Sequence, residues 1–123
     1  MTEAERKLLI IEDDLGNLKL ERDLLMIGGF DVITAENAED GIILALLEQP
    51  DVIIIDYQLP GINGIDASKI LGENEKTSHI PIVFVTASIT KEIIMKITAL
   101  GWKIIIKPIN TRTFSEEIRS VLK

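Results

Sequence analysis

Short runs of aliphatic residues alternate along the chain with longer segments in which apolar residues recur every three or four positions. The runs are about four residues long and rich in β-branched side chains, which is typical of strands buried on both faces of a parallel sheet. The predicted strands are Leu8–Ile11, Val32–Thr34, Val52–Ile55, Ile82–Val85 and Ile104–Ile106.

The intervening segments have the spacing of amphipathic helices, and several end at residues that stop a helix. Gly28 and Gly29 follow the first segment, Pro50 follows the second, and Gly101 follows the fourth. Glycine favours a helix C-terminus and proline cannot continue a helix. The predicted helices are Leu15–Ile27, 37–47, Ile65–Leu71, Thr90–Leu100 and Thr111–Leu122.

A strand followed by a helix, repeated five times, predicts an α/β fold with right-handed crossovers. We expect a five-stranded parallel sheet in the order 2-1-3-4-5, which is the flavodoxin-like, doubly wound (βα)5 arrangement. The chain has 123 residues and contains no apparent linker or repeat. A single domain over residues 1–123 therefore accounts for the whole pattern.

Composition narrows the possible functions. Cysteine is absent and there is one histidine, which excludes a thiol nucleophile, a disulfide framework and a multi-histidine metal site. The net charge of −7 makes direct binding to nucleic acid a poor prediction. No apolar run approaches the ~20 residues that a membrane helix needs, and no export signal is visible. We therefore expect a cytoplasmic protein with no membrane association.

Polar residues stand where four of the five predicted strands end. Asp13 and Asp14 follow the first strand, Asp56 the third, Thr86 the fourth and Lys107 the fifth. In the order 2-1-3-4-5 these four strand ends lie side by side, at the edge where open α/β sheets bind ligands. Carboxylates this close repel one another unless a cation lies among them. Oxygen ligands favour Mg²⁺, with Mn²⁺ as the alternative.

The same set of residues is suited to phosphoryl transfer. A carboxylate such as Asp56 can act as a nucleophile and form an aspartyl phosphate. The Lys107 ammonium and the Thr86 hydroxyl can hold the remaining phosphoryl oxygens, because catalysis of this transfer depends mainly on positioning and charge neutralisation. Each residue has an ordinary structural explanation when taken alone, and only their combination at neighbouring strand ends indicates a site.

These motifs resemble the receiver domain of response regulators, the CheY-like phosphoacceptor of two-component signalling, over essentially the whole chain. The segment around Pro108, Asn110 and Phe114 is similar to stand-alone receivers of the cell-cycle regulator type. The matching motifs are Asp13-Asp14, the segment from Pro50 to Asp56, Leu59-Pro60-Gly61-Ile62-Asn63-Gly64, Thr86-Ala87 and Lys107-Pro108.

The resemblance implies a role for each matching residue. Asp56 is the phosphoacceptor, and Asp13, Asp14 and the backbone carbonyl of Gln58 join it in binding Mg²⁺, with Asp14 acting partly through water. Thr86 contacts the phosphoryl group and relays its presence as part of the switch, and Lys107 pairs with Asp56 and later with the phosphate. The family also usually has a cis peptide bond between the lysine and the following proline.

The resemblance also implies partners. The phosphoryl donor is a sensor histidine kinase or a histidine phosphotransfer protein, and the phosphorylated state alters binding of a downstream protein. Such a domain catalyses its own phosphorylation and dephosphorylation and is not an enzyme for external substrates. It is expected to be a monomer or a weak, phosphorylation-dependent dimer.

Two departures from the family pattern lie in the region expected to act as the switch. Ile104 stands where an aromatic residue is usual, and it has no ring to rotate inward. The stretch from Thr86 to Lys107 is one residue short, with Trp102 in its turn. Trp102 either packs this turn against the fifth strand or contacts a partner. The alternative function is therefore an interaction module that keeps the pocket but whose output does not depend on phosphorylation.

Two enzymatic or ligand-binding classes fit less well. A phosphatase that forms an aspartyl phosphate needs a second acid two residues after the nucleophile, and Gln58 occupies that position. A nucleotide or flavin site needs a glycine-rich loop after the first strand, where this chain is acidic.

Overall fold

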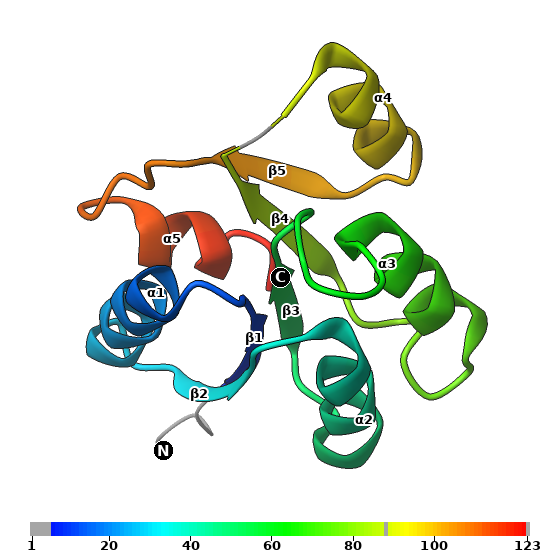
Figure 1. The fold of residues 1–123 in the computed structure, drawn as a ribbon. Coiled ribbons are helices and arrows are strands. Elements are labelled where there is room, and N and C mark those ends of the chain that lie inside the picture. The colour runs from blue at the N-terminus through cyan, green and yellow to red at the C-terminus, as the bar shows by residue number, and fades with distance from the viewer. Residues whose placement is uncertain (1–5, 88, 123) are drawn as a thin grey trace.

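The computed structural model describes residues 6–87 and 89–122, and within these ranges strands and helices alternate along the chain (Figure 1). The strands are β1 (Lys7–Ile11), β2 (Asp31–Ala35), β3 (Val52–Ile55), β4 (Ile82–Thr86) and β5 (Lys103–Ile106). The helices are α1 (Leu15–Ile27), α2 (Ala38–Glu48), α3 (Gly64–Glu73), α4 (Lys91–Ala99) and α5 (Phe114–Arg119).

The strands form one parallel sheet in the order β2-β1-β3-β4-β5, which confirms the predicted fold class and strand order. Helices α1 and α5 cover one face of the sheet, and α2, α3 and α4 cover the other (Figure 1). The chain order reverses between β1 and β3, so the carboxyl ends of β1, β3, β4 and β5 are neighbours along one edge.

Each central strand contributes side chains to two separate cores. In β1, Leu9 and Ile11 pack on the side of α2, α3 and α4, whereas Leu8 and Ile10 pack on the side of α1 and α5. Successive strand residues point to opposite faces, so a strand covered on both sides must be apolar at every position. This explains the continuous aliphatic runs in the sequence.

The helices begin where side chains can cap them. Asp14, Asn37, Asn63 and Thr90 each accept a hydrogen bond from a backbone N–H of the first helical turn. Such caps satisfy backbone donors that have no partner within the helix. The predicted start of α2 at Asn37 is confirmed as its N-cap.

Helix α5 is shorter than the predicted span of Thr111–Leu122. Thr113 and Phe114 donate to the carbonyl of Asn110 in a turn that precedes the helix, and Val121 and Leu122 follow it with tighter three-residue hydrogen bonds. Apolar spacing alone does not separate such turns from regular helix, because their side chains pack on the same core. No helix within the described residues has the length and apolar character needed to cross a bilayer.

Candidate functional site

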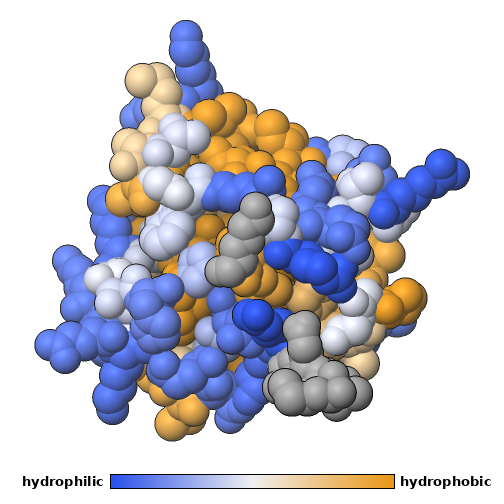
Figure 2. All heavy atoms as spheres, turned by 180° about the vertical axis from the view of Figure 1, so that it is seen from behind, coloured by the Kyte–Doolittle hydropathy of each residue, from blue (hydrophilic) through white to orange (hydrophobic). Residues whose placement is uncertain are grey.

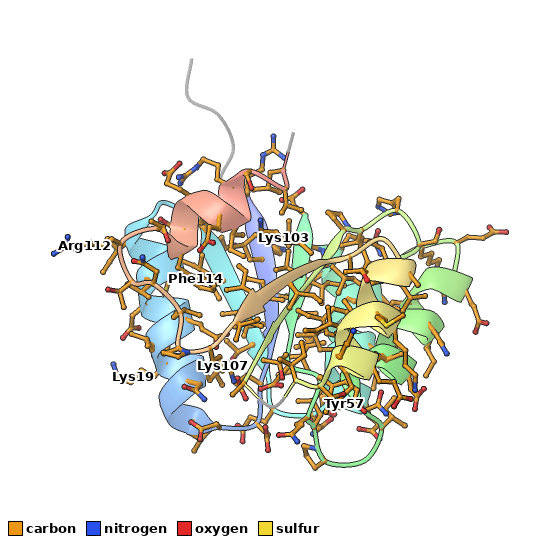
Figure 3. The ribbon with its side chains drawn as sticks, turned by 90° about the horizontal axis from the view of Figure 1, so that it is seen from above. Lys19, Tyr57, Lys103, Lys107, Arg112 and Phe114 are labelled. Atoms are coloured by element: carbon orange, nitrogen blue, oxygen red, sulfur yellow. The ribbon has the colours of Figure 1, made fainter. Side chains whose placement is uncertain are left out.

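The predicted metal-binding residues and the predicted lysine line one pocket of about 270 Å³ at the carboxyl edge of the sheet, whereas Thr86, Trp102 and Ile104 are not among its lining residues. Larger hollows exist elsewhere on the surface, so it is the chemistry of this pocket and not its size that distinguishes it. Figure 3 shows Lys107 and Tyr57 at this end of the sheet, whereas Lys103 lies at the opposite end of β5. The pocket is lined by Glu12, Asp13, Asp14, Asn17, Asp56, Gln58, Ala87 and Lys107.

Asp56, directly after β3, is the buried acid of the pocket, with 7% of its surface exposed. One carboxylate oxygen, Oδ1, accepts a hydrogen bond of 3.0 Å from the backbone N–H of Gln58. The other, Oδ2, lies 2.7 Å from the Nζ of Lys107. Both oxygens are therefore held in place, and the negative charge has the partner that burial requires.

Lys107 binds two carboxylates at once. Its Nζ lies 2.5 Å from Oε1 of Glu12 as well as 2.7 Å from Asp56. Burial alone would lower the pKa of Lys107, but the hydrogen bonds with Asp56 and Glu12 outweigh it and the net pKa is raised. Lys107 is therefore firmly protonated, as a cation placed to neutralise charge on Asp56 must be.

Glu12 is the residue that the sequence reasoning left out of the site. It is almost fully buried, and burial raises its pKa, although Lys107 and the backbone N–H of Asp14 oppose this rise. Its Oε2 accepts from that N–H at 3.2 Å. The signal was present in the sequence, because an acid that continues an apolar strand must find a buried partner.

Asp13 and Asp14 follow the same strand, but they have different roles in the structure. Both line the pocket and both are exposed. The Oδ1 of Asp14, however, accepts a hydrogen bond of 2.9 Å from the backbone N–H of Asn17 and caps α1. Asp13 does not cap the helix, so its carboxylate is the more available of the two for binding a ligand in the pocket.

Thr86 ends β4 beside Ala87, and its side chain is fully buried. Its backbone carbonyl accepts from the N–H of Lys107 at 3.0 Å. Among the buried side-chain oxygens and nitrogens of residues 6–87 and 89–122, only the Thr86 hydroxyl lacks a hydrogen-bond partner. A buried hydroxyl left without a partner is costly, so Thr86 stands out among the buried polar side chains near the pocket.

The loop after Asp56 is fixed by a close approach that only glycine allows. The N–H of Gly64 donates to the carbonyl of Tyr57 at 2.8 Å. A Cβ atom at position 64 would lie 2.5 Å from the carbonyl oxygen of Asp56, and 3.0 Å from the ring of Phe84. Gly64 therefore holds the Gln58 segment close to the acidic pocket.

The switch candidates at β5, Ile104 and Trp102, lie outside the pocket. Ile104 and Trp102 are both half-buried, and both pack against the core beneath α2, α3 and α4. The packing interpretation of Trp102 is thus confirmed, while part of its surface stays accessible. The peptide bond between Lys107 and Pro108 is cis, as the resemblance implied.

The pocket offers only a small number of side chains that could bind a metal ion. In the described part of the chain, no three His, Cys, Asp or Glu side chains are arranged to hold a metal by themselves. Mg²⁺ is usually bound by one or two carboxylates, with waters completing its shell. Asp13 and Asp56 both line the pocket beside Gln58, and two carboxylates are as many as this mode of binding requires.

Residues 8–119 match the model of the response regulator receiver domain, and the chain belongs to this family. Its five-stranded parallel sheet, with helices on both faces, is the fold of this class of signalling proteins. Members of this class are phosphoacceptors and not enzymes in the usual sense.

Curated relatives and solved structures agree with this assignment. The chain is 36% identical over 118 residues to the polar-differentiation response regulator DivK of Brucella anthropi, covering 95% of this chain and 96% of the relative. Its fold resembles chemotaxis response regulator CheY4 of Vibrio cholerae, with a TM-score of 0.88, 24% identity and coverage of 97% and 100%. The chain also resembles the structure of a response regulator from Desulfuromonas acetoxidans, with a TM-score of 0.85 and 27% identity. That match covers 95% of this chain and 96% of the other.

Proposed function

We propose that Asp56 accepts a phosphoryl group from a phosphohistidine donor, in a Mg²⁺-dependent reaction, and that the phosphorylated chain binds a downstream protein differently. The observation that carries this proposal is the buried Asp56 carboxylate, held between the Gln58 N–H and the Lys107 ammonium. The donor would be a sensor histidine kinase or a histidine phosphotransfer protein.

In this reaction an oxygen of Asp56 attacks the phosphorus, and an O–P bond forms as the donor's N–P bond breaks. The bonding electrons return to the imidazole of the donor. Lys107 stays protonated throughout and offsets the charge that the phosphoryl group brings, which is the main contribution a protein makes to this transfer. The buried Thr86 hydroxyl would donate to a phosphoryl oxygen and gain the partner that it lacks.

Asp13, Asp56 and the Gln58 carbonyl would hold the Mg²⁺ ion, with Asp14 contributing through water. When bound, the ion would neutralise the carboxylates and orient the phosphoryl oxygens. Glu12 has a different role in this scheme. Its two oxygens are occupied by Lys107 and by the N–H of Asp14, so it positions the lysine and the start of α1.

Replacing Asp13 with alanine is expected to weaken Mg²⁺ binding at least about tenfold, which corresponds to ~1.4 kcal/mol. Asp13 is exposed in the pocket and caps no helix, so the fold should be unaffected. Amide chemical shifts of Gln58 and Ala87, which line the pocket in both proteins, measure the affinity during a Mg²⁺ titration. Asp31→Ala, an exposed acid at the other end of the sheet, is the control. Equal affinity in Asp13→Ala and wild type would remove Asp13 from the metal site.

A second function has one specific observation in its favour. Ile104 packs against the core and has no aromatic ring that could move between two positions. Under this alternative the pocket is retained but the partner surface is the same with and without the phosphoryl group. Exposed apolar side chains available to a partner lie on α4 and β5. They include Met95, Leu100 and Ile106. Apolar atoms reach the surface in the upper part of the face seen in Figure 2.

Beryllofluoride with Mg²⁺, a mimic of the phosphoryl group, separates the two functions. The phosphorylation switch predicts amide shift changes in α4 and β5 as well as around Asp56. The interaction module predicts changes around Asp56 alone. Asp56→Asn is the control for binding of the mimic, and an unchanged spectrum of the wild-type chain would contradict the phosphoacceptor assignment itself.

Replacing Ile104 with tyrosine tests whether the pocket and the output surface are separable. The side chain at 104 does not line the pocket, so the rate of phosphorylation by acetyl phosphate should change less than about twofold. Affinity for the downstream partner should change, because a larger side chain must alter the packing beneath α4. Ile27→Tyr, at an exposed isoleucine in the last turn of α1, is the matched control. A large fall in phosphorylation rate in Ile104→Tyr would show that the two functions are coupled.

A further inference from the structure

Strand β2 is one of the two edge strands of the sheet, and part of its backbone faces outward. The backbone groups of Asp31 and Ala35 point toward β1. The N–H of Asp31 donates to the carbonyl of Arg6, just before β1, and the carbonyl of Ala35 accepts from the N–H of Glu12, just after it. Backbone groups of alternate residues in a parallel ladder point to opposite sides. The N–H and C=O groups of Val32 and Thr34 therefore point away from the sheet, where a further strand could pair with them.

Helix α2 lies beside this edge and exposes its larger apolar side chains. Its buried positions are the small residues Ala38, Gly41 and Ala45. Ile43 and Leu47, in contrast, are 55% and 73% exposed. A helix of a globular protein normally turns its large apolar residues inward. This inverted pattern leaves an apolar ridge along one side of α2.

A groove of about 560 Å³ joins the strand edge to this ridge. Thr34 and Ala35 of β2 line one side of it, and Ile43 and Leu44 of α2 line the other. Asp40, Ile43, Leu44 and Leu47 have the spacing of one continuous helix face, which places Leu47 on the same stripe. Within residues 6–87 and 89–122 no strand pairs with the outer edge of β2, so the groove combines an open strand edge with an apolar wall.

The charge of the groove selects its occupant. Glu36 and Asp40 line it and are exposed, and no lysine or arginine is among its lining residues. A second copy of this chain is a poor occupant, because two acidic grooves on chains of net charge −7 would repel. A segment that carries both aliphatic and basic side chains is complementary to it.

We propose that the groove between β2 and α2 binds an extended, basic and aliphatic segment of a partner protein, which adds a strand to the free edge of β2. Backbone hydrogen bonds to Val32 and Thr34 supply affinity, and alternate side chains supply specificity. Aliphatic side chains two residues apart cover Ile43 and Leu47, and a lysine or arginine on the same face meets Glu36 and Asp40. This surface lies apart from the Asp56 pocket and does not depend on its function.

To test the proposal, peptides that bind the whole chain are selected from a displayed library of random heptapeptides. The enriched peptides are expected to combine lysine or arginine with valine or isoleucine at alternate positions. The variants Asp40→Lys and Ile43→Ser should each weaken binding of an enriched peptide at least tenfold. The matched controls are Asp66→Lys, in the first turn of α3, and Ile70→Ser, a 43% exposed residue of that helix, and both should bind like wild type.

Hydrogen exchange then distinguishes strand addition from other modes of docking. Bound peptide should slow exchange of the Val32 and Thr34 amides at least tenfold and leave α4 and β5 unchanged. Three results would overturn the proposal: a library with no enrichment, peptides that bind Asp40→Lys and Ile43→Ser as well as wild type, or protection that falls outside β2.

Discussion

Asp56→Asn should incorporate no phosphoryl group from acetyl phosphate and Mg²⁺ under conditions that phosphorylate the wild-type chain. The amide replaces the nucleophilic carboxylate, while its remaining oxygen can still accept the hydrogen bond from the Gln58 N–H. Radiolabel retained on the purified chain measures the reaction. The loss should be complete, because the other acids of the pocket are committed to Lys107 and to the cap of α1 or lie exposed.

The control for this result is Asp51→Asn. Asp51 precedes β3 at the opposite end of the sheet, where its carboxylate accepts a hydrogen bond of 2.8 Å from the N–H of Lys7. This variant keeps the pocket intact and should be labelled like wild type. Equal labelling of Asp56→Asn and wild type would show that another residue accepts the phosphoryl group.

The free energy of unfolding should fall steeply with rising pH because of one buried acid in α1. Glu21 is 2% exposed between the core residues Leu18 and Leu25. Burial, together with the negative charge of Glu12, raises the pKa of Glu21 to about 8. The folded chain therefore holds a proton on Glu21 at neutral pH that the unfolded chain has released.

The sign of the effect follows from this proton balance. Between about pH 4.5 and pH 8 the folded state binds more protons at Glu21 than the unfolded state does, so stability decreases as pH rises. Stability from this group is greatest below that window and levels off above it. One pKa unit corresponds to ~1.4 kcal/mol, so the decrease is on the order of 3–5 kcal/mol between pH 5 and pH 9.

Glu21→Gln should remove this decrease, since the amide has a similar shape and does not titrate. Denaturant unfolding of both proteins at pH 5, 7 and 9 provides the measurement. The difference between them isolates Glu21 from other titrating groups, such as Glu12, that both proteins share. The variant should be the more stable protein at pH 9, and an identical pH dependence of the two proteins would contradict the buried, protonated state of Glu21.

Most of the fold could be predicted because β1, β3 and β4 are buried on both faces and must be apolar throughout. Their strand ends then brought Asp56, Thr86 and Lys107 to one edge of the sheet. The start of α2 at Asn37 was also predictable, because a polar cap precedes the helical pattern. The predicted length of α5 was wrong, because the turns on either side of this helix have the same apolar spacing as the helix itself.

The site was predicted less completely, and the reason lies in the three consecutive acids after β1. Sequence cannot say which of Glu12, Asp13 and Asp14 turns inward, because that depends on where the strand ends and the helix begins. The structure keeps Glu12 inside with Lys107 and uses Asp14 as a helix cap. The inward placement of Glu21 was equally hidden, since an acid within an amphipathic helix is normally exposed.

The most direct test of the account identifies the residue that carries the phosphoryl group. After reaction with acetyl phosphate and Mg²⁺, borohydride reduction converts an aspartyl phosphate to homoserine, which peptide sequencing locates. The account predicts homoserine at position 56 and at no other position. Homoserine at position 13 or 14, or a labelled chain without any homoserine, would contradict the assignment of Asp56 as the phosphoacceptor.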